Sequence, residues 1–437
     1  MKKVLTLLVV SMFFAGLAFA TETRVEGLGV ATWQTLDDNA IVFDFAGQLS
    51  NYKNIAVIEQ TSPNTGVGGV TLGLDGMSLG VFVGKNTILL GSILGDIPAI
   101  SNNASVNGLN VNNVKNSLIA SAQASAPVNL LYAIDLSDMS IGIGLGYVSS
   151  GAGWENKTPD SAKDVYSSTA REINALLGLT MGSIDVGLKL ALPSIYINLD
   201  EQAYVGGSSQ AYNEDTLDIG GFGLDLLGRI NLGEALLASL GFGYSSGSSK
   251  FTTKADNNGD GKFDNAADNN EEYTNDFSNI TVNLGISKEI KAQTAKAICG
   301  VMAGYSLDSS TTGKSKDVIT GTEAKGTEES TSTIYLFADL GAEAKLNDTF
   351  SIRGGISQPL LSIASTTTKN LDTDPVAEES SGSDSTNNTT VSLGASATVG
   401  SFTFDVLVSQ DILLKGPDFI GGDPTSLNSK IAVKYVW

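Results

Sequence analysis

The sequence contains no histidine among its 437 residues and a single cysteine, Cys299. The lack of histidine excludes Ser-His-Asp and Cys-His catalysis, and it also excludes histidine metal sites. One cysteine cannot form an intramolecular disulfide. Cys299 falls on an apolar strand face, where a buried or lipid-facing thiol is expected rather than a reactive one. Because no nucleophile lies beside a base, the sequence predicts a protein that is not an enzyme.

Charge and proline are also scarce. Charged residues make up 17% of the chain, and 9 prolines stand beside 49 glycines. This composition favours many strands and tight packing over a disordered chain. The 26 basic and 47 acidic side chains give a net charge of −21. Nucleic acid is therefore excluded as a partner, because phosphate binding needs clustered Lys and Arg. An acidic surface of this kind attracts divalent cations instead.

The one long apolar run lies at the start of the chain. Lys2 and Lys3 precede an apolar core at residues 4–17, and residues 18–20 read Ala-Phe-Ala. This pattern predicts a secretory signal peptide over residues 1–20. No later stretch offers the roughly 18 consecutive apolar residues that a transmembrane helix requires. An exported chain without such a helix can span lipid only as a closed barrel.

The last eight residues alternate in polarity, as the side chains of a strand alternate between its faces. One face carries Ile431, Val433, Tyr435 and Trp437, and the other carries Lys430, Ala432, Lys434 and Val436. An apolar face ending in aromatics is typical of a lipid-facing strand. The end resembles the closing strand of bacterial outer-membrane barrels, which implies recognition of Trp437 by the barrel-assembly machinery. The alternative is an ordinary amphipathic edge strand.

The same period of two recurs from residue 54 onward, most clearly at residues 140–148, 184–192, 333–346 and 391–399. A soluble sandwich would also alternate, but the connections here are short and long in turn. Long polar ones are predicted at residues 150–168, 198–215, 247–276 and 308–330. Bacterial barrels have short periplasmic turns and long outer loops. We therefore predict an all-β fold, a transmembrane antiparallel barrel in the bacterial outer membrane, with lipid around it.

Residues 21–52 lack clean alternation, so we expect a small N-terminal hatch or plug-like segment, with the barrel formed by residues 53–437. Their order is Gly27-x-Gly29-x-Ala31, then Asp37-Asp38, then Phe43 before Asp44-Phe45-Ala46-Gly47. It resembles the start of the FadL-type family of long-chain fatty-acid transporters and of related PorV-type barrels, which have Asn-Pro-Ala-Gly at the last position. The resemblance implies hatch residues Asp44, Phe45, Ala46 and Gly47. It also favours about 14 strands, whereas a direct count gives about 16.

An acidic stretch at residues 256–264 is the sharpest local motif. Its oxygen-bearing side chains and its glycine are spaced as in the first part of an EF-hand calcium loop. The twelfth position is Ala267 rather than an acid, and an acid follows one place later. The alternative is an acidic, solvated loop. The candidate Ca²⁺ ligands are Asp256, Asn258, Asp260, Lys262 (through its carbonyl), Asp264 and Asp268.

Charged side chains on the inward strand faces are predicted to line the lumen. They are Asp135, Lys189, Asp225, Asp339, Glu343, Arg353 and Asp405. Such charges must be hydrated or paired, so they either line a solute path or form an internal network that holds the barrel and its plug. Glycines such as Gly142 and Gly243 leave room for an inserted segment. We expect passive uptake of small hydrophobic molecules. The alternatives are a general polar-solute porin and a structural or assembly partner of an outer-membrane or secretion complex.

Overall fold

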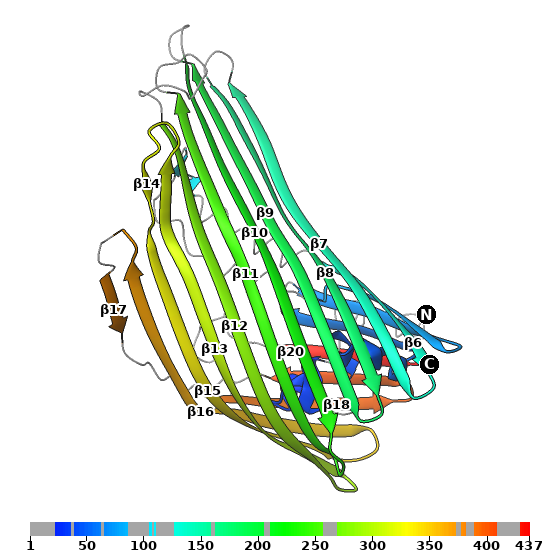
Figure 1. The fold of residues 1–437 in the computed structure, drawn as a ribbon. Coiled ribbons are helices and arrows are strands. Elements are labelled where there is room, and N and C mark those ends of the chain that lie inside the picture. Colours follow the sequence, from blue (N-terminus) through cyan, green and yellow to red (C-terminus); the bar gives the residue numbers. More distant parts are fainter. Residues whose placement is uncertain are drawn as a thin grey trace, which may run out of the picture.

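The computed structural model describes residues 22–35, 39–62, 65–85, 105–106, 109–110, 126–158, 162–204, 210–256, 269–372, 377–381, 389–408 and 429–437. Within these ranges, sixteen antiparallel strands form one closed barrel (Figure 1). They are β1 (Ile55–Ser62), β2 (Thr65–Leu74), β3 (Met77–Val83), β6 (Val128–Leu136), β7 (Met139–Thr158), β8 (Ala162–Met181), β9 (Ile184–Tyr204), β10 (Gln210–Asn231), β11 (Leu236–Asp256), β12 (Asn269–Lys291), β13 (Ala295–Asp317), β15 (Thr327–Lys345), β16 (Phe350–Asn370), β18 (Thr390–Val399), β19 (Phe402–Val408) and β20 (Ser429–Val436).

The barrel closes between its first and last strands. β1 pairs with β20 from Ile55 opposite Val436 to Gln60 opposite Ile431. Two short strands, β14 (Glu323–Ala324) and β17 (Ala377–Ser381), add to β13 and β16, and β4 (Ser105–Val106) and β5 (Leu109–Asn110) form a separate pair. The prediction of about 14 wall strands is wrong. The short strands β1 to β3 belong to the wall, because their ladder is continuous from β20 to β6.

Short turns gather at one end of the barrel, where the chain also enters β1 and leaves β20. The Trp437 N–H donates to the Asn54 carbonyl there, at 3.2 Å. Gly182, in the turn between β8 and β9, has φ +56°, a conformation that favours glycine. The short turns at this end are where the sequence predicts them, but the connection predicted to be long between β7 and β8 is only residues 159–161, so the alternation of short and long connections holds only in part. In bacterial outer-membrane barrels the short turns face the periplasm, and the corresponding orientation of this chain stays a prediction.

The wall is much taller on one side than on the other (Figure 1). The strands β7 to β13, β15 and β16 have 19–23 residues, whereas the remaining wall strands have 7–10. A bilayer crossing needs only about 9–11. Most residues of the predicted long loops at 150–168, 198–215, 247–276 and 308–330 are therefore strand, and the prediction of irregular loops there is wrong. The outward positions of these extensions are mostly polar, so the strands lack the apolar period of the belt and the sequence pattern missed them.

An apolar belt surrounds the lower part of the barrel. On β7, the outward side chains Ile141, Ile143, Leu145 and Tyr147 are 43–62% exposed, while the glycines between them are buried on the inward side. Exposed apolar side chains occupy the same band on the other tall strands. Cys299 is exposed among them. A continuous apolar surface of this extent is characteristic of a wall that faces lipid.

Residues 22–35 and 39–52, called here the N-terminal segment, lie inside the barrel near its short-turn end (Figure 1). They form α2 (Glu22–Gly27), η1 (Thr32–Gln34), η2 (Asn39–Phe43) and η3 (Ala46–Asn51). The helix α2 packs on β16 and β18 to β20, and η3 packs on β3 and β6 to β9, so the segment crosses the lumen. No helix within the described ranges is long and apolar enough to cross a membrane.

Apolar side chains anchor both ends of the N-terminal segment. Near η3, a buried cluster joins Phe43 and Leu49 to Phe82, Leu131 and Leu176 of the wall. The Phe43 and Phe82 rings meet edge to face, with centroids 4.8 Å apart. A second cluster near α2 packs Val25, Leu28 and Val30 on Ile298. The lumen is therefore filled at this level by a small apolar core as well as by polar contacts.

Candidate functional site

Glycines of the inner wall shape the surface on which the N-terminal segment lies. A Cβ at Gly142 would lie 2.2 Å from the backbone of Ala46, and one at Gly187 would lie 1.8 Å from the carbonyl oxygen of Asp44. Real side chains do not approach so closely, so only glycine permits these contacts. Further glycines meet the segment's backbone in the same way, namely Gly178, Gly341 and Gly355. The wall thus has room for a polypeptide backbone where other residue types would exclude it.

An ion pair on two neighbouring strands forms the centre of the polar contacts. Arg229 of β10 and Asp185 of β9 are cross-strand partners. The Arg229 Nε and Nη2 atoms donate to Asp185 Oδ2 at 2.9 and 2.6 Å. Their side chains are only 4% and 7% exposed. A buried pair of this kind is stable only if its remaining donors and acceptors are also satisfied.

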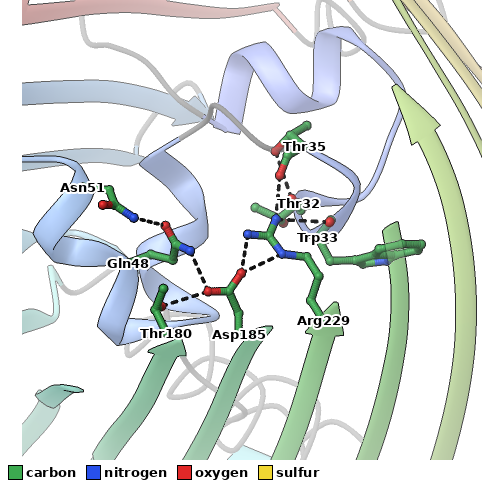
Figure 2. A network of polar contacts seen from close by, with 8 residues as sticks. All are labelled: Thr32, Trp33, Thr35, Gln48, Asn51, Thr180, Asp185 and Arg229. Carbon is green, nitrogen blue, oxygen red and sulfur yellow. Dashed lines mark hydrogen bonds and ion pairs between the residues drawn. The ribbon is translucent and has the colours of Figure 1, made fainter. Parts of the chain in front are cut away.

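The N-terminal segment supplies most of those remaining partners (Figure 2). Arg229 Nη1 donates to the Thr35 carbonyl at 2.7 Å, and Gln48 Nε2 donates to Asp185 Oδ1 at 2.6 Å. The hydroxyl of Thr180, on the wall, donates to the same oxygen at 2.8 Å. The Arg229 guanidinium also lies 5.2 Å from the ring centroid of Phe45. Without the segment, water in the lumen would have to replace these partners.

Four further ion pairs surround this centre. Three of them join the segment to β9, β15 and β20. The fourth joins the linker that precedes β1 to a side chain of β6. They are Asp44–Lys189 at 2.6 Å, Arg24–Glu343 at 2.8 Å, Glu26–Lys430 at 2.6 Å and Lys53–Asp135 at 2.7 Å. All are partly exposed, so each contributes about 1 kcal/mol or less. Their distribution around the lumen positions the segment on several sides at once.

Most predicted lumen charges take part in these contacts. Asp135, Lys189 and Glu343 pair with the segment or its linker, as given above. Asp339 accepts from Gln34 Nε2 at 3.0 Å and from the Ser357 hydroxyl at 2.6 Å. Two others, Arg353 and Asp405, form a buried ion pair with each other on the wall. Asp225 is half-buried and lies opposite Lys189 in the ladder.

The four hatch residues implied by the family resemblance lie at the junction of η2 and η3. Asp44 makes its ion pair there, Phe45 is fully buried under Arg229, and Ala46 and Gly47 pack on the glycine surface. Sequence reasoning did not single out Arg229. The available signal was its position four residues after Asp225, on the same inward face of one strand.

The predicted calcium loop falls mostly outside the described residues. Five of its six candidate ligands, Asn258, Asp260, Lys262, Asp264 and Asp268, lie there, and only Asp256 is described, as the buried last residue of β11. In the described part of the chain, no group of three or more acidic or cysteine side chains is placed to hold a metal ion. Calcium binding by this loop stays a prediction.

The inner face of the tall wall is apolar above the N-terminal segment. Ile195 and Ile197 of β9 and Leu217 and Ile219 of β10 are at most 1% exposed, and Phe251 of β11 is 2% exposed. By strand alternation they lie on the same inward face as Asp185 and Arg229. Porin lumens are polar and water-filled. This inner face therefore differs from the lining that a general channel for polar solutes requires.

No protein-family model matches the sequence, and no curated protein matches it. Several solved structures resemble the fold. The toluene transporter TodX from Pseudomonas putida has 12% identity and a TM-score of 0.30, over 71% of this chain and 82% of that one. The monoaromatic hydrocarbon channel CymD has 9% identity and a TM-score of 0.36, over 97% and 98%. The ferric yersiniabactin uptake receptor FyuA from Yersinia pestis has 10% identity and a TM-score of 0.38, over 82% of this chain. This chain spans 60% of that receptor's length.

Proposed function

We propose that this chain is a bacterial outer-membrane barrel for passive uptake of small hydrophobic molecules, in which the N-terminal segment is a hatch. The observation that carries the proposal is the position of the segment across the lumen, held by side-chain contacts centred on Arg229 and Asp185. A barrel of about sixteen strands is wide enough to leave an aqueous channel if nothing fills it. A segment held without covalent bonds can move aside and return.

The apolar inner face of the tall wall supports a hydrophobic cargo. Ile195, Ile197, Leu217 and Ile219 lie on the long-strand side of the segment, where a molecule from outside would enter. These side chains are at most 1% exposed, so they support a hydrophobic cargo through the apolar character of this part of the inner wall and not through surface that is open to a solute. Membership of the FadL-type family, which the opening motif suggests, is part of the same proposal.

Transport into proteoliposomes tests the proposal. We expect a small apolar fluorescent probe to enter vesicles that contain the barrel faster than vesicles without protein. A polar solute of similar size should enter vesicles with the barrel no faster than vesicles without it. Equal passage of both probes would indicate a general porin. Passage of neither probe would refute uptake as the function.

The height of the wall favours one alternative, a structural or assembly role. Strands such as β12 and β13 continue well beyond the apolar belt and present polar residues there. Such a projecting sheet offers surface to a partner of an outer-membrane or secretion complex. If the barrel transports neither probe and a stable partner cross-links to cysteines placed on this projection, the assembly role replaces uptake.

A further inference from the structure

The strand β7 has a partner on only one side over its outer half. From Met139 to Tyr147 it pairs with both β6 and β8, and β6 begins there, at Val128 opposite Tyr147. Beyond Tyr147 the ladder with β8 continues without a break to Thr158. Among the described residues, no strand lies on the other side of residues 148–158 (Figure 1). Above the belt, β7 is therefore one edge of the tall wall.

This edge offers unpaired backbone groups to a further strand. In an antiparallel ladder, successive residues direct their N–H and C=O groups to opposite sides of the strand. Every second residue of 148–158 therefore points one donor and one acceptor away from β8. The described part of the chain supplies no other backbone hydrogen bond to these residues. At about 3.3 Å per residue, the edge is roughly 35 Å long.

The opposite edge of the tall wall, β16, is largely covered. Its first residues, 350–357, pair with β18, and its last residues, 366–370, pair with β17. Pro359 lies in the stretch between them and, without an N–H, hinders a continuous ladder there. Short covering strands and prolines are devices by which proteins keep a sheet edge from pairing with another chain. Residues 148–158 of β7 contain no proline, and no described strand covers them.

A second copy of this chain in the same membrane does not fit the β7 edge. Two such copies are related by a half-turn about the membrane normal. Because barrel strands tilt by about 35–45° from that direction, the half-turn sets the two β7 strands at about 70–90° to each other, and they cross instead of forming a ladder. The strand β16 of a copy would run parallel to β7, since both strands leave the short-turn end, and Pro359 and β17 hinder that pairing.

The residues along the edge favour an extended polypeptide with large side chains. The outward positions Ser149, Gly151 and Gly153 are small and exposed. The nearest atoms that a Cβ at either glycine would meet belong to β8, so the side away from β8 is open. A glycine in an edge strand leaves its backbone uncovered, and an aromatic side chain on the neighbouring strand can lie across it. Aromatic and β-branched residues therefore suit the positions opposite these glycines best.

We propose that the outer half of β7 binds an extended segment of another protein, which adds a strand antiparallel to β7 along residues 148–158. The bound segment lacks proline and places aromatic or β-branched side chains opposite Gly151 and Gly153. Strand addition of this kind derives affinity from main-chain hydrogen bonds and specificity from alternate side chains. Binding at this edge goes beyond the proposed uptake and does not depend on it, because the N-terminal segment contacts β7 lower down, at Gly142.

A synthetic strand peptide tests the edge on the whole barrel in nanodiscs. The peptide alternates Thr and Tyr over about ten residues, enough to span the edge. Its control carries N-methyl groups on all amides, which keep the side chains and remove the donors. We expect the peptide to slow hydrogen exchange of residues 148–158 at least tenfold and the control to leave it unchanged. Each ladder hydrogen bond changes affinity by roughly two- to tenfold, so the control should bind at least tenfold more weakly.

Two matched cysteine variants locate the bound peptide, both made with Cys299→Ala. Ser149→Cys lies on the open edge, whereas Ser248→Cys lies on β11, where the strand is paired on both sides. Both serines are exposed on the outer face of the wall. We expect a strand peptide with one cysteine in place of a central Tyr to form a disulfide with the Ser149→Cys variant and not with the Ser248→Cys variant.

Several results would overturn strand addition at this edge. They are unchanged exchange of residues 148–158 with the peptide, equal effects of the peptide and its N-methyl control, or equal disulfide formation by the two cysteine variants. Copies of the Ser149→Cys variant that cross-link to each other without peptide would assign the edge to a second copy. Slow exchange of residues 148–158 before any peptide is added would show that the chain itself covers the edge. A barrel that fails to take up apolar molecules leaves the expected peptide binding unchanged, so the two failures are distinguishable.

Discussion

The substitution Arg229→Met tests the polar centre that holds the N-terminal segment. Methionine keeps a long apolar side chain and removes the guanidinium. Asp185 then loses donors at 2.9 and 2.6 Å while its side chain stays only 7% exposed, and the Thr35 carbonyl loses its donor at 2.7 Å. The variant thus leaves a buried carboxylate beside the segment without its counter-charge.

Leaving one member of a buried ion pair alone destabilises a protein by about 3–5 kcal/mol. Most wall hydrogen bonds in β9 and β10 are unaffected by this change, so the barrel itself is expected to stay folded. Movement of the segment lets water reach Asp185 and relieves the penalty. The penalty of the unpaired Asp185 therefore lowers the free energy needed to detach the segment from the wall. Since each 1.4 kcal/mol is a factor of ten, opening should rise roughly 100-fold or more.

Hydrogen exchange of residues 22–35 and 39–52 in nanodiscs measures this opening. The matched control is Arg171→Met, which removes an exposed arginine of β8 whose Nε donates to Ser194 at 3.0 Å. We expect the control to change exchange of the segment less than about threefold, as for exposed contacts generally. Equal exchange in Arg229→Met and the control would refute the reasoning.

A double variant isolates the orphaned charge as the cause. Arg229→Met combined with Asp185→Leu removes both charged groups, so no carboxylate is left buried. Exchange of the segment should then fall below that of Arg229→Met alone, because replacing both partners of a buried pair is far less destabilising than removing one. Exchange equal to or faster than the single variant would contradict this explanation.

Three further changes probe other parts of the account. Gly187→Ala places a methyl group 1.8 Å from a carbonyl oxygen of the segment, so it should destabilise the docking of the segment on the wall by about 1–3 kcal/mol. The control Gly220→Ala, whose methyl group would have no atom within 4 Å, should leave hydrogen exchange of the segment unchanged. Asn174→Leu removes a buried amide that has no hydrogen-bond partner among the described residues, and it should raise barrel stability by about 1–3 kcal/mol. A lower melting temperature on heat-modifiability gels would contradict this. Calcium should protect the outer tip near Asp256 from protease, and the variant Asp256→Ala/Asp260→Ala should lose that protection; cleavage unaffected by chelator in wild type would reject the calcium loop.

The barrel wall was predictable from sequence wherever its two faces meet different environments. On β7, lipid selects Ile141 and Leu145 outward while the N-terminal segment selects Gly142 inward, so the period of two is plain. Beyond Tyr147 the outward positions are Ser149, Gly151 and Gly153, so the apolar period of the outward face ends although the ladder continues to Thr158. The strand extensions were missed for this reason.

Contacts between distant parts of the chain could not be predicted. Arg24 and Glu343 are 319 positions apart, and nothing local to either residue indicates the other. Arg229 shows the same limit, because it was not singled out from the sequence and its role depends on contacts with Thr35 and, through Asp185, with Gln48. Most of the other lumen charges were predicted from the sequence, but the partners of these charges could be identified only from the fold.

A disulfide between the segment and the wall tests the central claim most directly. The hydroxyl oxygens of Ser50 in η3 and Ser140 in β7 lie 2.9 Å apart, so the variant Ser50→Cys/Ser140→Cys, made with Cys299→Ala, can close a bond across the contact. A matched control is Ser351→Cys/Ser396→Cys, which links two wall strands whose hydroxyls are 2.6 Å apart. We expect oxidation to stop uptake of the apolar probe in the first variant, reversibly with reductant, and to leave the control unaffected. Undiminished uptake through a barrel whose segment is verifiably cross-linked would contradict the hatch.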